Sequence, residues 1–227
     1  MTEHEVALTG GNINTGVVRV GNTVRRAMTA ASPAVHQLLL HLARKGFAGG
    51  PQYLGIDEQG REILSYIEGE TGILDSNWQH DEALVAAARL LRRYHDATVD
   101  FAARDDLPWA YRYPDPTRHE VICHNDFAPY NFVYRNGIPC AVIDFDLAGP
   151  GPRLRDVAYA AYWMVPLSFN SDNQRSFAEI DAGDGSRRFR LFCKTYGMSI
   201  TPALFEMIAE VLNHMGSKDA ARRMVGD

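Results

Sequence analysis

Apolar residues along the chain follow two periods, which divide it into a strand-rich first third and a mainly helical remainder. Short β-rich runs separated by glycine-containing turns predict strands at residues 6–8, 17–20, 23–28, 51–57 and 62–67. Apolar residues spaced three or four apart predict helices at residues 32–46, 81–98, 186–196, 201–215 and 217–225, and another from Val157. The pattern therefore predicts a small sheet with one helix, followed by a helical part.

One β-hairpin interrupts the helical part. The runs Asn131–Arg135 and Ile138–Asp144 flank the dipeptide Asn136-Gly137, which favours a type I′ turn because both central residues of that turn need positive φ. Polar side chains stand at the outer ends of both runs: His124, Asp126, Asn131, Asp144 and Asp146. Closing the hairpin brings the start of its first strand near the end of its second, so we expect Asp126, Asn131 and Asp144 to converge.

These three side chains suit a divalent cation and a hydroxyl group. Oxygen ligands from Asn131 and Asp144 favour Mg²⁺, which keeps several waters and is completed by substrate phosphates. Asp126, held nearby but off the metal, can accept a proton from an attacking hydroxyl. The spacing from His124 through Asp126 to Asn131 matches the H-x-D-x-x-x-x-N loop of protein kinases, in which the aspartate is the base and the asparagine binds metal.

The segments HNDFAPYNFVY and VIDFDLAGPGPRLRDVAY together resemble the aminoglycoside phosphotransferase and choline kinase family. The resemblance implies an α+β, two-lobed, protein-kinase-like fold. A small N-terminal antiparallel sheet with one helix forms a nucleotide-binding lobe over residues 1–68. A mainly helical lobe over residues 69–227 carries catalysis and acceptor binding. No Ala-Pro-Glu follows Asp144, and Asp146 stands in place of the glycine of Asp-Phe-Gly, so small-molecule kinases fit better than protein kinases.

The nucleotide phosphates need a glycine-rich turn and a cation. The turn at residues 10–16 resembles the family's phosphate loop, and its backbone contacts are expected at Gly11, Asn12 and Asn14. The following strand has no lysine. Because side chains alternate along a strand, Arg26 shares a face with the apolar Val24, so Arg26 is preferred as the phosphate contact. Arg25 is the second choice, and two solvated arginines are the plain alternative.

Two further regions complete the expected nucleotide site. Tyr66 and Ile67 stand at the break before Glu68, where the resemblance implies an adenine-binding hinge, although core packing explains their side chains equally well. The helix at 32–46 starts at Ser32 as N-cap and lacks the acid that pairs with the strand cation in protein kinases. For His36, a packed or half-exposed histidine is favoured, and a neutral partner for Arg26 is the alternative.

Two other polar residues are expected to support the structure. His95 lies near the apolar face of the helix at 81–98, where a structural histidine is favoured over a catalytic one. Asp156 is expected to be the N-cap of the helix that starts at Val157. It also resembles the family aspartate that ties this helix to the catalytic loop.

Composition limits the partners and the location. The 227 residues contain 23 basic and 28 acidic side chains, a net charge of −5, which argues against nucleic acid as an obligatory partner. No apolar run reaches the roughly 20 residues that span a bilayer, and the polar, acidic N-terminus does not resemble a signal peptide. Three cysteines without metal-ligand spacing are typical of reduced thiols in a cytoplasmic protein.

The sequence therefore predicts an enzyme that uses ATP (or GTP) and Mg²⁺ to phosphorylate a hydroxyl of a small molecule. One alternative is a degenerate kinase that binds nucleotide without transfer. The other is a metal-dependent hydrolase that uses His124, Asp126, Asp144 and Asp146. Neither the acceptor nor the oligomeric state can be read from the sequence.

Overall fold

A computed structural model describes residues 4–8, 16–72, 80–101, 106–165 and 182–216. Its first part is a five-stranded antiparallel sheet in the order β1-β2-β3-β5-β4. The strands are β1 (Glu5–Ala7), β2 (Val18–Val20), β3 (Thr23–Arg26), β4 (Tyr53–Ile56) and β5 (Glu62–Ser65). Strands β3 and β5 pair so that Arg26 lies directly opposite Glu62.

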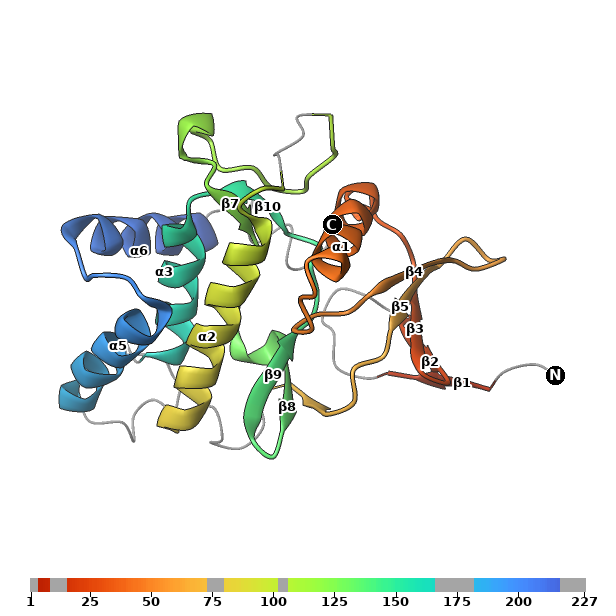
Figure 1. Ribbon diagram of the computed structural model, residues 1–227, viewed down its shortest axis with the longest axis horizontal. Helices are drawn as coiled ribbons and strands as arrows, with labels where there is room; N and C mark the ends of the chain where they lie inside the picture. Colours follow the sequence, from red (N-terminus) through yellow and green to blue (C-terminus); the bar gives the residue numbers. More distant parts are fainter. Residues whose placement is uncertain (1–3, 9–15, 73–79, 102–105, 166–181, 217–227) are drawn as a thin grey trace.

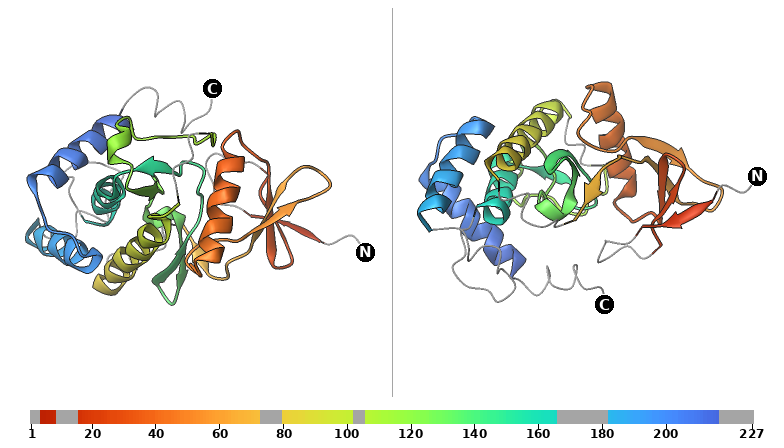
Figure 2. Two further views of the ribbon diagram at one scale, coloured as in Figure 1. Left: turned by 45° about the horizontal axis from the view of Figure 1, so that its top comes forward. Right: turned by 90° about the horizontal axis from the view of Figure 1, so that it is seen from below.

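Helix α1 (Ser32–Arg44) lies between this sheet and the helical part of the molecule (Figures 1 and 2). Pro33 suits the first turn because its fixed φ is helical and its missing N–H has no partner there. The prediction that Ser32 is the N-cap is wrong: Ala31 holds that position. The Ser32 hydroxyl instead accepts a hydrogen bond from the N–H of Thr29 at 2.9 Å.

The second part begins with β6 (Glu70–Thr71), which pairs with β8 (Phe132–Arg135) in the three-stranded sheet β6-β8-β9. The predicted hairpin is confirmed. Strand β9 spans Ile138–Val142, and the turn residues Asn136 and Gly137 have φ of 51° and 74°. Strands β7 (Val121–Cys123) and β10 (Gly149–Gly151) form a separate pair.

Four helices build the rest of the described structure: α2 (Asp81–Thr98), α3 (Arg153–Met164), α5 (Ala182–Tyr196) and α6 (Pro202–Met215). Helix α2 packs against α5, β9 and β7, and its inner face is fully buried from Leu84 to Tyr94. In Figure 1 these helices lie on the side away from the N-terminal sheet, with the β8–β9 hairpin between the two parts. The predicted helix at 217–225 lies outside the described residues.

Short 3₁₀ turns occur in the second part at Pro116–Arg118, between α2 and β7, and at Pro129–Asn131. The second of these turns lies between β7 and β8 and ends at Asn131, so the start of the hairpin is part of a regular turn. None of the helices among the described residues combines the length and apolar character that a membrane crossing requires.

Candidate active site

Asp126 lies in the loop between β7 and β8, where three side-chain groups donate hydrogen bonds to its carboxylate. The hydroxyls of Tyr130 and Tyr159 donate to Oδ1 at 2.5 and 2.7 Å. Asn131 Nδ2 donates to Oδ2 at 2.7 Å and to the main-chain oxygen of Asp126 at 3.0 Å. The carboxylate is therefore fixed in orientation, and the amide nitrogen of Asn131 is turned toward it. This leaves Asn131 Oδ1 as the amide atom that can coordinate a cation.

The end of the hairpin is tied to the same loop by main-chain contacts. The N–H of Ile143 donates to the Asn131 carbonyl at 2.8 Å, and His124 Nε2 lies 3.1 Å from the Ile143 carbonyl. Asp144 follows directly with φ of 65°, a left-handed conformation that is uncommon for a non-glycine residue. The predicted convergence of Asp126, Asn131 and Asp144 agrees with this arrangement. His124 braces the loop, as expected.

Arg26 reaches this cluster from β3 and contacts three carboxylates. Its Nε donates to Glu62 Oε1 at 2.5 Å, its Nη2 to Asp146 Oδ1 at 2.5 Å, and its Nη1 to Asp146 Oδ2 at 3.2 Å and Asp144 Oδ1 at 3.3 Å. Burial acts to lower the pKa of Arg26, but the three carboxylates outweigh it and raise that pKa, so the guanidinium stays charged.

Glu62 provides the acid that the sequence lacks on α1. Its Oε2 lies 2.6 Å from His36 Nε2, and its side chain is fully buried. The interpretation of His36 as a direct partner of Arg26 is wrong, because Glu62 lies between the two. The reason is the pairing of β3 with β5, which puts Glu62 directly across from Arg26, where facing side chains are closest.

The cluster carries more negative than positive charge. Glu62, Asp144 and Asp146 together face the guanidinium of Arg26. Desolvation and the neighbouring Asp146 raise the pKa of Asp144, and Arg26 offsets this only in part. A divalent cation bound by Asp144 and Asn131 would offset the negative charge of Asp144 and Asp146. The ligand atoms of Asp144 and Asn131 are oxygens, the type that Mg²⁺ takes. The donor set therefore fits the metal that the resemblance implies.

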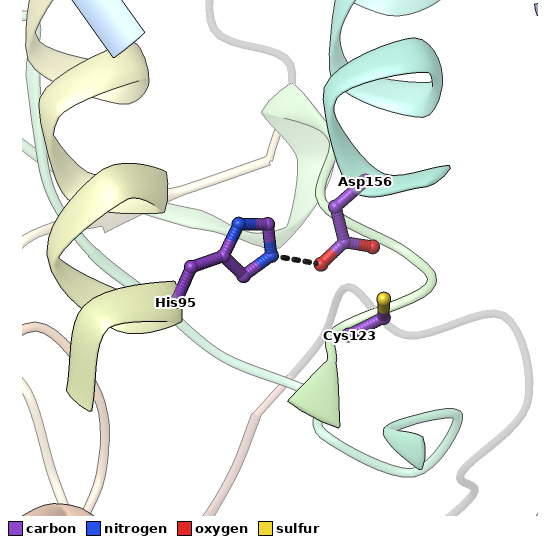
Figure 3. A group of neighbouring side chains, drawn as sticks. All are labelled: His95, Cys123 and Asp156. Carbon is purple, nitrogen blue, oxygen red and sulfur yellow. Dashed lines mark hydrogen bonds and ion pairs between the residues drawn. The ribbon is translucent and has the colours of Figure 1, made fainter. Parts of the chain in front are cut away.

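A second group of ligand types lies deeper, where Figure 3 shows His95 of α2 beside Asp156 of α3 and Cys123 of β7. The ligand atoms of the three residues lie within 4.8 Å of one another, but their hydrogen bonds are already satisfied. His95 Nε2 lies 3.0 Å from Asp156 Oδ2, and His95 Nδ1 lies 2.7 Å from the hydroxyl of Tyr196. Burial raises the pKa of Cys123 well above its usual value, so the thiol keeps its proton. This group stabilises the fold and does not provide a metal site.

The carboxylate of Asp156 binds backbone N–H groups of the loop that carries Asp126. Its Oδ2 accepts the N–H of His124 at 2.6 Å, and its Oδ1 accepts the N–H of Asn125 at 2.8 Å, the residue that precedes Asp126. The prediction that Asp156 is an N-cap is wrong, because α3 begins at Arg153 after Pro152 and Asp156 lies in its first turn. The expected tie between this helix and the loop is present, and His95 supports it as the predicted structural histidine.

The remaining predicted nucleotide contacts are not tested by the structure. Gly11, Asn12 and Asn14 lie outside the described residues. Tyr66 and Ile67 follow β5 and are half-buried in the connection to β6. The N–H of Tyr66 donates to the Asn22 carbonyl at 2.8 Å, and the guanidinium of Arg19 stacks on its ring at 3.8 Å. These contacts explain the side chain of Tyr66 and leave the hinge role as a prediction.

Three residues of the site were not predicted from the sequence: Glu62, Tyr130 and Tyr159. Tyr130 lies within the loop motif itself, directly before Asn131, and could have been noticed there. Glu62 could have been found by pairing the predicted strands at 23–28 and 62–67. Tyr159 gives no local signal, because only the packing of α3 brings it to Asp126.

Comparison with known proteins relates this geometry to one family. Residues 99–192 match the model described as the phosphotransferase enzyme family, APH. The chain is 36% identical over 200 residues to a protein named "Trifolitoxin immunity protein" from Rhizobium leguminosarum bv. trifolii. The aligned region covers 86% of this chain and 75% of that relative.

Solved structures share the fold at low identity. The amicoumacin kinase hAmiN, in a complex with AMP-PNP and Ca²⁺, superposes with a TM-score of 0.59 at 12% identity, over 98% of this chain and 85% of its own. Aminoglycoside phosphotransferase APH(3'')-Id from Streptomyces rimosus gives 0.60 at 14%, over 92% and 91%. APH(2")-IIa, in its gentamicin complex, gives 0.58 at 14%, over 98% and 88%. The predicted protein-kinase-like fold is confirmed.

Proposed function

This chain belongs to the phosphotransferase enzyme family, and we propose that it transfers the γ-phosphate of ATP or GTP to a hydroxyl group of a small molecule. The observation that carries this proposal is the carboxylate of Asp126, which is oriented by Tyr130, Tyr159 and Asn131. Phosphoryl transfer needs this arrangement because its transition state is loose, so catalysis consists of positioning and charge stabilisation.

Each residue of the site has a distinct role in this proposal. Asp126 orients the acceptor hydroxyl and takes its proton as the oxygen–phosphorus bond forms. Asn131 and Asp144 hold Mg²⁺, which when bound neutralises charge on the phosphate oxygens. Arg26 binds the phosphates, together with the backbone of Gly11, Asn12 and Asn14, and Tyr66 and Ile67 border the adenine. We place the division between the nucleotide-binding and catalytic lobes at Glu68.

The similar proteins suggest which acceptors to try first. The kinases of similar fold are named for amicoumacin and for aminoglycosides, and the 36% identical relative is named for immunity to trifolitoxin. We propose an acceptor of this broad kind, a hydroxylated antibiotic or toxin. The three cysteines are free thiols, of which Cys123 and Cys193 are buried, which supports a reaction in the cytoplasm.

A screen for acceptor-stimulated release of ADP or GDP tests the proposal, with the Asp126→Asn variant as its control. We expect this variant to lose most turnover, about 100-fold or more, and to keep its nucleotide affinity, because the base acts on the acceptor and not on the nucleotide. Turnover at the parental rate in the Asp126→Asn variant would show that the assigned base is wrong.

A second candidate is a protein that binds nucleotide without transferring phosphate. It is favoured by one observation: Arg26 replaces the expected lysine and its Nη atoms contact Asp144 and Asp146. Calorimetric binding of ATP in a protein that releases no ADP with any acceptor or with water would support this second candidate.

A further inference from the structure

Arg26 is held at two ends that differ in accessibility. The Nε end contacts Glu62, whose side chain is 1% exposed and lies between the sheet and α1. The Nη end contacts Asp146 and Asp144, whose side chains are 23% and 44% exposed. An incoming anion can therefore reach the Nη end of the guanidinium and cannot reach the Nε end.

The buried end is rigid because each group in it is fixed by another. Both oxygens of Glu62 are engaged, Oε1 by Arg26 and Oε2 by His36. The ring of His36 stacks on Tyr53 of β4 at a centroid distance of 3.9 Å and an interplanar angle of 17°. Glu62 and Arg26 are also paired across β5 and β3. Helix α1 and three strands of the sheet thus hold the Nε atom of Arg26 in one place.

We propose that Glu62 and His36 are positioning residues that make the Nε atom of Arg26 a fixed pivot, and that nucleotide phosphates replace Asp146 and Asp144 at its Nη atoms. The inference rests on the proposed function, since it concerns how the nucleotide is bound. Guanidinium suits this arrangement better than ammonium does, because its planar fork separates the donor used for anchoring from the donors used for phosphate.

The proposal gives two acidic residues around one arginine opposite effects on nucleotide binding. Asp146 competes with the phosphates for the Nη atoms, so removing its charge favours binding. Glu62 aims those same atoms at the phosphates, so removing its charge lets the guanidinium turn fully toward Asp146 and weakens binding. Simple electrostatics predicts otherwise, because losing either negative charge strengthens the binding of a polyanion.

Titration calorimetry of the intact protein with AMP-PNP in EDTA tests this without metal, acceptor or turnover. We expect Glu62→Gln to raise the Kd for AMP-PNP about tenfold, the size of one lost charge-assisted hydrogen bond. We expect Asp146→Asn to lower the Kd. A Glu62→Gln variant that binds AMP-PNP as tightly as the parent, or more tightly, would overturn the proposal.

Two controls separate positioning from charge and from misfolding. Asp57→Asn removes one negative charge from the turn between β4 and β5, at a carboxylate that pairs with Arg61 at 2.8 Å and Arg25 at 3.8 Å, without touching Arg26. We expect it to leave the Kd nearly unchanged. His36→Gln retains a donor for Glu62 and should bind like the parent, whereas His36→Leu should behave like Glu62→Gln at a similar melting temperature.

The outcomes distinguish this inference from the proposed function. If the parent protein binds no nucleotide, the proposed function fails and the inference fails with it. If the parent binds and His36→Leu and His36→Gln have the same Kd, only the inference is overturned. This pair decides the question even where Glu62→Gln does not fold.

Discussion

The hydrogen bonds around Asp126 restrict how an acceptor can meet it. A carboxylate offers about four acceptor positions, and the two tyrosine hydroxyls and the Asn131 amide take three of them. The free position is the second one on Oδ2, the oxygen that accepts the Asn131 amide. In the proposed reaction, an acceptor hydroxyl binds at that position or displaces a tyrosine hydroxyl from Oδ1.

We therefore predict that Tyr159→Phe lowers turnover about tenfold and leaves the nucleotide Kd unchanged, because it removes one donor that orients Asp126. The measurement is the rate of ADP release with an acceptor, or with water if none is found. Tyr162→Phe on the same helix is the matched control, since no contact joins it to Asp126 among the described residues. Equal rates in both variants would contradict an orienting role for Tyr159.

At the residue scale, the sequence is informative wherever neighbours in the chain are also neighbours in space. Asp126 and Asn131 are five residues apart in one loop, so their spacing alone predicts their contact. The choice of Arg26 over Arg25 follows from strand alternation, and of the two only Arg26 contacts the carboxylate cluster. Glu62 escapes prediction because the acid is expected on a helix, and strand pairing that joins residues 36 positions apart supplies it instead.

At the element scale, α3 positions the loop that carries Asp126 through one buried carboxylate. Asp156 accepts two backbone N–H groups of the loop and contacts His95. Burial acts to raise the pKa of Asp156, but the His95 hydrogen bond and the backbone donors outweigh it and hold that pKa below its usual value. The contacts with the loop and with His95 therefore favour the charged form of Asp156.

We predict that Asp156→Asn lowers the free energy of unfolding by about 3 kcal/mol, since it leaves buried donors without a charged acceptor. Urea unfolding measures this change. Asp115→Asn is the matched control: Asp115 also accepts a backbone N–H, that of Thr117, but it is exposed. A loss for Asp156→Asn no larger than that of the control would show that the tie contributes little to stability.

The pair of His95 and Asp156 predicts that acid lowers the stability of the fold. Burial lowers the pKa of His95 below its usual 6.5. As the pH falls below about 6.5, the imidazole takes up a proton in the unfolded chain while it is still neutral in the folded protein. Stability is therefore fully present above about pH 6.5 and falls as the pH drops below it, by at most about 1.4 kcal/mol per pH unit for this group. Depression of the Asp156 pKa acts in the same direction at lower pH.

Urea unfolding at about pH 7.5 and about pH 5.5 measures this dependence. We expect His95→Gln to have a lower free energy of unfolding than the parent at the higher pH. Between the two pH values, the variant should lose less of that free energy than the parent does. If the parent and the variant lose equal stability on acidification, His95 is not the group that titrates.

Elements are predictable to different degrees for physical reasons. The Asn136-Gly137 turn is encoded locally, because few dipeptides tolerate two positive φ values, and it forms as predicted. The sequence pattern places the start of α3 at Val157, four residues too late, because Arg153–Asp156 is polar and resembles a loop. In the structure Arg155 is buried, with its Nε on Asn125 Oδ1 at 2.8 Å, so a polar first turn packs inward.

At the scale of the whole molecule, a short segment after Tyr66 connects the N-terminal sheet to the helical part. After β5 the chain leaves the N-terminal sheet, and β6 pairs with β8 of the second part. The Nε of Arg135 donates to the Glu68 carbonyl at 3.0 Å. Gly69 lies between these contacts with φ of 152°, and a Cβ there would meet the Tyr134 carbonyl oxygen at 2.5 Å. The connection thus depends on a residue without a side chain.

We predict that Gly69→Ala lowers the free energy of unfolding by about 2–4 kcal/mol, because strained φ and a backbone clash add together. Gly60→Ala is the matched control, since Gly60 has φ of 77° and a Cβ added there would meet no atom within 4 Å, and it should lose only about 1 kcal/mol. Urea unfolding compares the stability of the two variants, and titration calorimetry compares their Kd values for AMP-PNP. Because the β5–β6 connection sets how Arg26 on the sheet faces Asp144 on the hairpin, Gly69→Ala should also weaken nucleotide binding, and Gly60→Ala should not. Equal stability and equal Kd values in the two variants would mean that the connection tolerates a side chain and that other contacts hold the lobes together.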